Sequence, residues 1–135
     1  MKKNCWNNLG KCGDTYYTIF RVVIGLLFLV HGIMKFSGGA PASGLMWAAA
    51  LAEIAAGAFV LLGLWSRLGG LIGAVTMLVA YIFHATAMFS GWAGLNPMSN
   101  GGEMAVLYLV AFLVVMKEGN GKLSLEQKLT GKEQF

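Results

Sequence analysis

Long apolar runs dominate the chain, and they constrain its fold more than any motif does. Four such segments can be marked, at about 15–36, 44–65, 68–92 and 100–117. Each of the first three has the roughly 20 residues that a helix needs to cross a bilayer. The fourth reaches roughly 27 Å only if Asn100 and Glu103 open the helix as a capping pair. The pattern predicts an integral membrane protein.

The composition agrees with this prediction. Of the 135 residues, 57% are hydrophobic and 12% charged, whereas a soluble domain usually carries about 25% charged residues. Residues 1–14 are polar and the apolar run after them is long, which indicates a retained spanning helix rather than a cleaved signal peptide. We therefore expect one domain: a polar segment at 1–14, a membrane domain at 15–118 and a polar tail at 119–135.

The connections between the segments predict the architecture. Residues 37–43 and the pair 66–67 are short links, and 90–102 is a longer one containing Gly and Pro. Short links make neighbouring helices antiparallel, so we expect an all-α, up-down four-helix bundle.

The Lys and Arg residues in the flanks predict orientation, because cytoplasmic loops are enriched in them. Lys35 lies on one side, and the other side carries the larger set: Lys2, Lys3, Lys11, Arg67, Lys117, Lys122, Lys128 and Lys132. We expect both termini to be cytoplasmic in a multi-pass protein of the cell membrane. The net charge of +4 suits contact with anionic lipid headgroups, and nothing in it indicates a nucleic-acid partner.

Polar side chains recur inside the apolar segments and give the candidate ligand-binding or proton-linked residues. They are Arg21, His31, Lys35, Glu53, His84, Glu103 and Tyr108. The helical rise places Glu53 and His84 about 12–14 Å below the outer face. A charge at the bilayer centre costs about 2.5–3.5 kcal/mol on insertion scales. Glu53 should therefore be paired or protonated.

The partner of Glu53 is open at this stage. Arg21 could rise toward it, or Lys35 or His31 could approach from above; otherwise Arg21 extends to the cytoplasmic interface and Glu53 is neutral. Small residues share a helical face with Glu53, among them Gly57, and would allow a second helix to approach closely.

On the fourth segment, Glu103 and Tyr108 are about 140° apart around the helix axis. The two side chains cannot both point straight at the centre of the bundle.

The two histidines allow several interpretations. His31 and His84 could be axial ligands of a haem, hydrogen-bonding anchors for a quinone head group, or satisfied polar residues of the core. We favour the small-molecule or proton-linked role over haem. The spacing of His and Glu is not diagnostic of a zinc site, and we expect no metal.

The polar positions together resemble the DoxX family over about residues 15 to 126. The residues that carry the resemblance are Arg21, Gly25, Phe28, His31, Gly32, Lys35, Glu53, Gly57, Gly63, Arg67, His84, Glu103 and Tyr108, followed by the "SLE" that ends at Glu126. The resemblance implies a small four-helix membrane protein, often associated with respiratory or sulfur redox chemistry. Relatives include subunits described with thiosulfate:quinone oxidoreductase and with terminal quinol oxidase. More distant relatives act as assembly chaperones for ligand-gated channels.

Two functions follow as expectations. In the first, the chain is a quinone- or lipid-binding subunit of a membrane redox system. His31, His84 and Tyr108 would contact the head group, Glu53 would exchange protons, and a protein partner would supply electrons. In the second, it is a non-catalytic assembly factor or partner-binding module. The sequence leaves open whether the chain belongs to an enzyme, as an accessory subunit of a quinone-linked oxidoreductase, and whether it self-associates.

Overall fold

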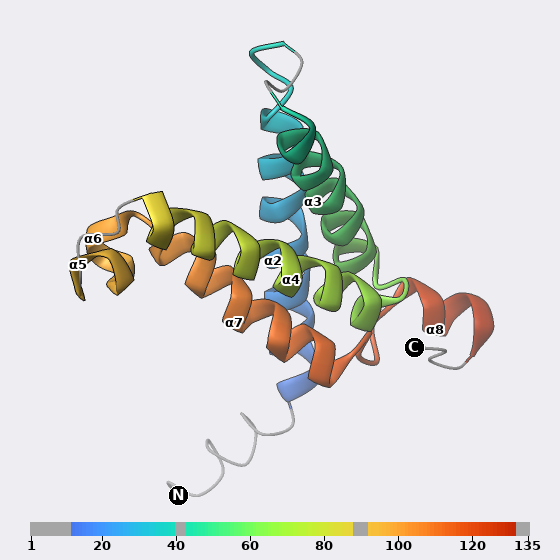
Figure 1. Ribbon diagram of the computed structural model, residues 1–135. Coiled ribbons are helices and arrows are strands. Elements are labelled where there is room, and N and C mark those ends of the chain that lie inside the picture. Colours follow the sequence, from blue (N-terminus) through green and yellow to red (C-terminus); the bar gives the residue numbers. More distant parts are fainter. Residues whose placement is uncertain (1–11, 40–42, 88–91, 132–135) are drawn as a thin grey trace, which may run out of the picture.

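The computed structural model describes residues 12–39, 43–87 and 92–131, and over these residues the regular structure is entirely helical (Figure 1). The four long helices are α2 (Gly13–Met34), α3 (Gly44–Leu62), α4 (Ser66–Ala87) and α7 (Glu103–Glu118). Three short ones are α5 (Trp92–Leu95), α6 (Pro97–Asn100) and α8 (Leu125–Thr130). Helices α2, α3 and α4 are long and apolar enough to cross a membrane, whereas α7 has 16 residues.

Large apolar side chains on the outward faces of the long helices are exposed. Examples from the four helices are Leu27, Leu51, Leu71 and Leu107. Exposed apolar surface on this scale suits lipid rather than water. The protein is thus a multi-pass membrane protein whose helices contact lipid.

Helices α2 and α3 form a tightly packed antiparallel hairpin because glycines face each other along it. A Cβ added to Gly25 would lie 2.5 Å from the Leu61 nitrogen, and one added to Gly57 would lie 2.5 Å from the Leu29 nitrogen. No side chain fits at either position, so the two backbones lie against each other. The close helix approach predicted beside Glu53 is confirmed.

Helices α4 and α7 form the second hairpin, and the core lies where the two hairpins meet. A Cβ on Gly73 would lie 2.7 Å from the ring of Phe112, which is fully buried. From α2, the fully buried ring of Phe28 packs on Phe112 and Tyr108, with centroid distances of 4.5 and 5.4 Å. Aromatic rings from α2 and α7 thereby fasten the two hairpins together.

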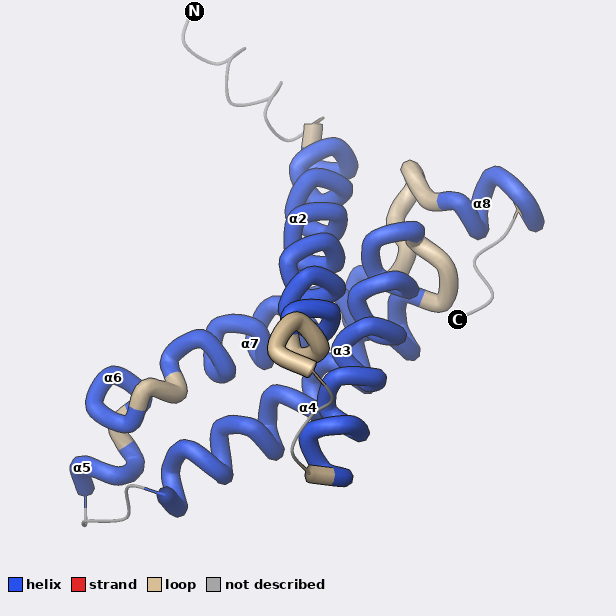
Figure 2. The backbone as a smooth tube through the Cα atoms, turned by 90° about the horizontal axis from the view of Figure 1, so that it is seen from above, coloured by secondary structure: helices blue, strands red, loops and turns tan. Residues whose placement is uncertain are grey.

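The hairpins diverge instead of lying parallel. They converge where α2 begins, α3 ends, α4 begins and α7 ends, with α8 beside them, and they separate toward their other ends (Figures 1 and 2). We call the first region the closed end and the second the open end. The antiparallel order of neighbours is the expected one, while the angle between the hairpins opens space between them.

The boundary between α3 and α4 differs from the expected one. Helix α3 ends at Leu62, and Gly63 adopts a left-handed conformation with φ of 68°. The backbone N–H groups of Gly63 and Leu64 both donate to the carbonyl of Phe59, a common way to end a helix at glycine. The turn therefore occupies residues 63–65, not 66–67.

The start of α7 also differs from the expected one. Asn100 ends α6, Gly101 follows with φ of 73°, and α7 begins at Glu103. The side chain of Asn100 accepts a hydrogen bond from the Gly102 nitrogen at 2.7 Å. The predicted capping pair of Asn100 and Glu103 is wrong. The Asn100 side chain forms its hydrogen bond within this local turn, and Gly102 is the residue that precedes α7.

Candidate functional site

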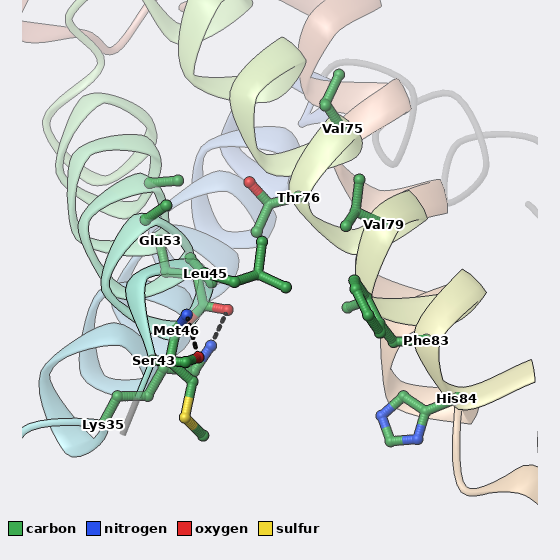
Figure 3. A pocket seen from close by; sticks show the side chains of 14 residues that line it. Lys35, Ser43, Leu45, Met46, Glu53, Val75, Thr76, Val79, Phe83 and His84 are labelled. Atoms are coloured by element: carbon green, nitrogen blue, oxygen red, sulfur yellow. Dashed lines mark hydrogen bonds and ion pairs between the residues drawn. The ribbon is translucent and has the colours of Figure 1, made fainter. Parts of the chain in front are cut away.

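A cavity of about 520 Å³ lies between α3 and α4 at the open end (Figure 3). We call it the α3/α4 cavity. Its walls are mainly apolar, with a row of alanines on α3 facing larger side chains on α4. The lining residues are Lys35, Ser43, Leu45, Met46, Ala48, Ala49, Ala52, Glu53, Val75, Thr76, Val79, Ala80, Phe83 and His84.

A second cavity of about 440 Å³ shares some of these lining residues, and we call it the α2/α7 cavity. It has Phe28 and His31 from α2, and Tyr108 from α7, in its lining. The two cavities share Lys35, Glu53, Ala80 and His84. Lys35, Glu53 and His84 therefore line both spaces at the open end.

Lys35 and Glu53 form the ion pair at the centre of this site. Lys35 Nζ lies 2.6 Å from Glu53 Oε1, and the Glu53 side chain is 1% exposed against 24% for Lys35. Lys35 follows the last residue of α2, so its long side chain reaches the carboxylate from the open end. Of the two predicted alternatives for Glu53, paired or protonated, the structure shows the paired one, and the partner is Lys35.

The Glu53 carboxylate is only half satisfied. Its second oxygen, Oε2, is buried and has no hydrogen-bond partner among the described residues. A buried acceptor without a partner costs about 1–3 kcal/mol, and most buried polar groups avoid this cost. Glu53 thus combines an incompletely satisfied carboxylate with a position in the lining of both cavities.

The other predicted residues of the open end do not all line the cavities. His84 lines both cavities, whereas His31 and Tyr108 line the α2/α7 cavity. Glu103 is exposed on the first turn of α7 and lines neither cavity. The predicted angle between Glu103 and Tyr108 accounts for this difference, since only Tyr108 faces inward.

Arg21 belongs to the closed end and does not approach Glu53. Its side chain is 2% exposed, and Nη1 donates to the carbonyl of Val60 at 2.6 Å. Nη2 donates to the carbonyl of Leu123 at 3.0 Å. The last carbonyls of a helix have no partner within it, and the guanidinium supplies donors to those of α3. The possible pairing of Arg21 with Glu53 is therefore wrong.

A polar cluster around Glu126 completes the closed end. Glu126 Oε2 accepts from the Trp65 nitrogen at 3.0 Å and from the side chain of Asn120. Asn120 Oδ1 accepts from the Ser66 nitrogen at 2.8 Å. These side chains satisfy donors at the start of α4, as caps do at other helices.

Sequence reasoning placed this cluster in a polar tail and missed its structural role. One signal was available: Ser124 and Gln127 have the spacing of a capping box. In the structure Ser124 Oγ accepts from the Gln127 nitrogen at 3.3 Å and starts α8. A pair of residues that can start a helix indicates that this part of the predicted polar tail is folded.

The open end can hold an amphiphilic molecule. Aliphatic walls suit an apolar body, and the carboxylate, ammonium and imidazole groups offer both acceptors and donors. Among the described residues, no group of three or more His, Cys, Asp or Glu is placed to hold a metal ion.

Comparisons with known proteins identify the relatives of the chain. A family model described as DoxX matches residues 17–86, which include Lys35, Glu53 and His84. An uncharacterized protein of Haemophilus influenzae is 34% identical over 132 residues, covering 90% of this chain and 96% of the relative. No solved structure matches the chain.

Proposed function

The chain belongs to the DoxX family, and on that premise we propose that it is a membrane subunit that binds a quinone or a comparable lipid-soluble molecule at the open end. The observation that carries the proposal is the ion pair between the partly exposed Lys35 and the buried Glu53, which line two cavities whose walls are mainly apolar. A buried charge inside a membrane protein is costly and usually serves a function.

The size of the α3/α4 cavity supports a small molecule. Its volume of about 520 Å³ lies within the range of about 300–1,000 Å³ that is common for ligand pockets. A helix with its side chains is about 10–12 Å across, so the same space would take little more than one turn of a partner helix. The cavity itself therefore suits a small molecule better than a partner helix.

Charge supports an orientation for this site. Arg67, Lys117 and Lys122 lie toward the closed end and Lys35 toward the open end, so the closed end faces the cytoplasm in this proposal. The four long helices then form the membrane-embedded bundle of a cell-membrane protein with both termini cytoplasmic. The ligand binds in the outer half, where Glu53 is placed to exchange a proton with its head group, and a partner protein exchanges electrons with it.

Mass spectrometry of an organic extract tests the proposal. The wild-type protein, purified in mild detergent, should carry a quinone or similar molecule in stoichiometric amount. Glu53→Leu should lose at least nine-tenths of it, because the polar anchor is gone. Glu103→Leu is the matched control, since Glu103 lies outside both cavities, and it should retain the wild-type amount.

The opposite result would favour the alternative function. If only bulk phospholipid is recovered, or if both variants retain the molecule equally, the cavity is not its binding site. A non-catalytic assembly or partner-binding role would then be the better explanation, and copurification of one membrane partner would support it.

A further inference from the structure

A groove at the closed end lies between α2, the end of α3 and the segment that leads into α8. We call it the α3/α8 groove, and its volume is about 300 Å³. Aliphatic side chains from all three segments contribute most of its lining: Val22, Leu61, Leu62, Leu123 and Leu125. Apolar walls beside two helices that are long enough to span a membrane suit a hydrocarbon chain.

Hydrogen bonds fix the position of α8 against the other two helices, so the groove is preformed. The backbone nitrogen of Glu126 donates to the carbonyl of Gly63 at 3.2 Å, directly after the end of α3. From α2, Arg21 Nη2 donates to the carbonyl of Leu123 at 3.0 Å. Helix α8 thereby lies beside the closed end (Figure 1). A preformed groove binds a ligand without the cost of first ordering its walls.

The charges that line the groove are all positive. Arg21 and Lys128 are among the lining residues, and no described Asp or Glu is. Arg21 is 2% exposed and donates to backbone carbonyls, and neither cation forms an ion pair with a carboxylate of the described residues. The carboxylate of Glu126 lies outside the lining, where it accepts from the Trp65 nitrogen. A buried charge usually has a counter-ion, and here an anion from outside the chain would supply it.

The two cations contribute to anion binding in different ways. The Arg21 side chain is too deeply buried to touch a ligand, so it acts through its electric field, which is weakly screened in an apolar setting. Lys128 is exposed at the groove, where its ammonium group can donate directly to an anionic oxygen.

A neighbouring pocket at the same end has a different charge balance. Its lining contains Asp14 and Glu118 as well as Lys122, and Lys122 Nζ already lies 2.6 Å from the Asp14 carboxylate. The uncompensated positive charge is therefore a property of the α3/α8 groove and not of every pocket at the closed end.

We propose that the α3/α8 groove binds one anionic phospholipid, with Lys128 on the headgroup phosphate and an acyl chain along Leu61 and Leu62. Basic pockets beside membrane-spanning helices recognise anionic headgroups in this way. An acidic peptide fits less well, because its backbone would lose hydrogen bonds to water against the aliphatic walls. A free phosphate ion would leave those walls unused. This lipid site is independent of the ligand proposed for the open end.

Native mass spectrometry of the full chain in mild detergent tests the proposal. Phosphatidylglycerol and phosphatidylcholine with identical acyl chains are titrated separately, and the dissociation constants of the first bound lipid are compared. Phosphatidylglycerol should bind at least about fivefold more tightly, a factor that corresponds to about 1 kcal/mol, the value of one cation near an anionic surface. Equal binding, or tighter binding of phosphatidylcholine, would overturn the proposal.

A charge substitution then locates the headgroup. Lys128→Gln should reduce the preference for phosphatidylglycerol to about twofold or less. Lys117→Gln is the matched control, since Lys117 is an exposed cation of the same end that lies outside the groove, and it should keep the wild-type preference. An undiminished preference in Lys128→Gln, or an equal loss in both variants, would overturn the assignment of the headgroup to this groove.

A substitution in the wall locates the acyl chain. Leu62→Trp adds an indole ring at the groove and should weaken phosphatidylglycerol binding at least about fivefold, because the ring takes the space of the chain. Leu107→Trp makes the same change on the exposed face of α7 and should leave binding unchanged. Full binding by Leu62→Trp would mean that no chain lies in the groove, and it would overturn the lipid assignment in favour of a simple anion site.

Discussion

The closed end and the open end each bury a charged side chain, and the two side chains have different hydrogen-bond partners. Arg21 is surrounded by carbonyl oxygens of α3 and of the segment before α8, to which both its terminal nitrogens donate. Glu53 has one partner, Lys35, and one oxygen without any among the described residues. Each group keeps one buried polar atom without a partner among the described residues, Nε of Arg21 and Oε2 of Glu53. The two groups differ in the partners that they do have, which are backbone carbonyls for Arg21 and one partly exposed side chain for Glu53. Fixed backbone partners favour a structural role for Arg21, whereas in the proposed function the less firmly held Glu53 serves a ligand.

The largest expected effect on stability comes from Arg21→Met. The substitution leaves the carbonyls of Val60 and Leu123 without their donors, at the point where α2, α3 and the segment before α8 meet. We expect the free energy of unfolding to fall by about 3 kcal/mol, since each hydrogen bond to a charged group is worth about 1.5–3 kcal/mol. Thermal unfolding in detergent measures the change. The control is Lys117→Met, an exposed cation at the same end, and an equal loss there would contradict the assignment.

Gly63→Ala should have the next largest effect. Gly63 has φ of 68°, and a Cβ there would lie 2.5 Å from Arg21 Nη1. Left-handed backbone costs an L-residue about 1–2 kcal/mol, and the contact with Arg21 adds to that cost. The matched control is Gly131→Ala, where φ is 69° but nothing lies within 4 Å of the added carbon. Equal destabilisation by both substitutions would mean that the Arg21 contacts contribute little.

Glu53→Leu should change stability less than either substitution at the closed end. The substitution removes a buried charge whose desolvation cost is only partly offset by the ion pair. The Lys35 side chain is partly exposed, so it can turn toward solvent when its partner is lost. We expect the free energy of unfolding without ligand to stay within about 1 kcal/mol of the wild-type value. Thermal unfolding of ligand-free protein measures this. A loss as large as that of Arg21→Met would make Glu53 a structural residue and remove the contrast between the ends.

The smallest effect is expected at the exposed pair of Lys122 and Asp14, whose charged atoms lie 2.6 Å apart. The hydrogen bond to Asp14 raises the pKa of Lys122 above its ordinary value near 10.5. A raised lysine pKa contributes stability below that ordinary value and loses it as the pH rises through the folded-state pKa. That contribution is present throughout pH 6 to 9 but small, because both side chains are exposed. Lys122→Met should therefore lower the melting temperature only slightly, and equally at pH 6 and at pH 9. A clear decrease of the melting temperature in that range would mean that this exposed ion pair also stabilises the closed end.

The sequence predicted the features that depend on local pattern. Apolar segments of about 20 residues were enough to identify the membrane helices, and small residues beside Glu53 were enough to predict close packing of a second helix. Helical geometry predicted that Glu103 and Tyr108 would not both face inward, but not which of the two would. These features depend on the spacing of residues within one helix.

The sequence did not predict features that depend on how separate helices meet. The partner of Arg21 could not be found from depth alone, because its acceptors are backbone carbonyls that any residue provides. The role of Glu126 required knowing that α8 folds back against the start of α4. The two cavities arise from the angle between the hairpins, which no spacing within a single helix encodes.

The most direct test of the account is to find where a ligand binds. A quinone analogue with a photoreactive diazirine on its ring is irradiated with the purified protein, and the labelled residues are identified by peptide mass spectrometry. Label concentrated in residues 43–53 and 75–84, and reduced by an excess of unlabelled quinone, is the predicted result. Label spread equally over lipid-facing residues such as Leu107 and Val110, with no competition, would contradict a binding site at the open end.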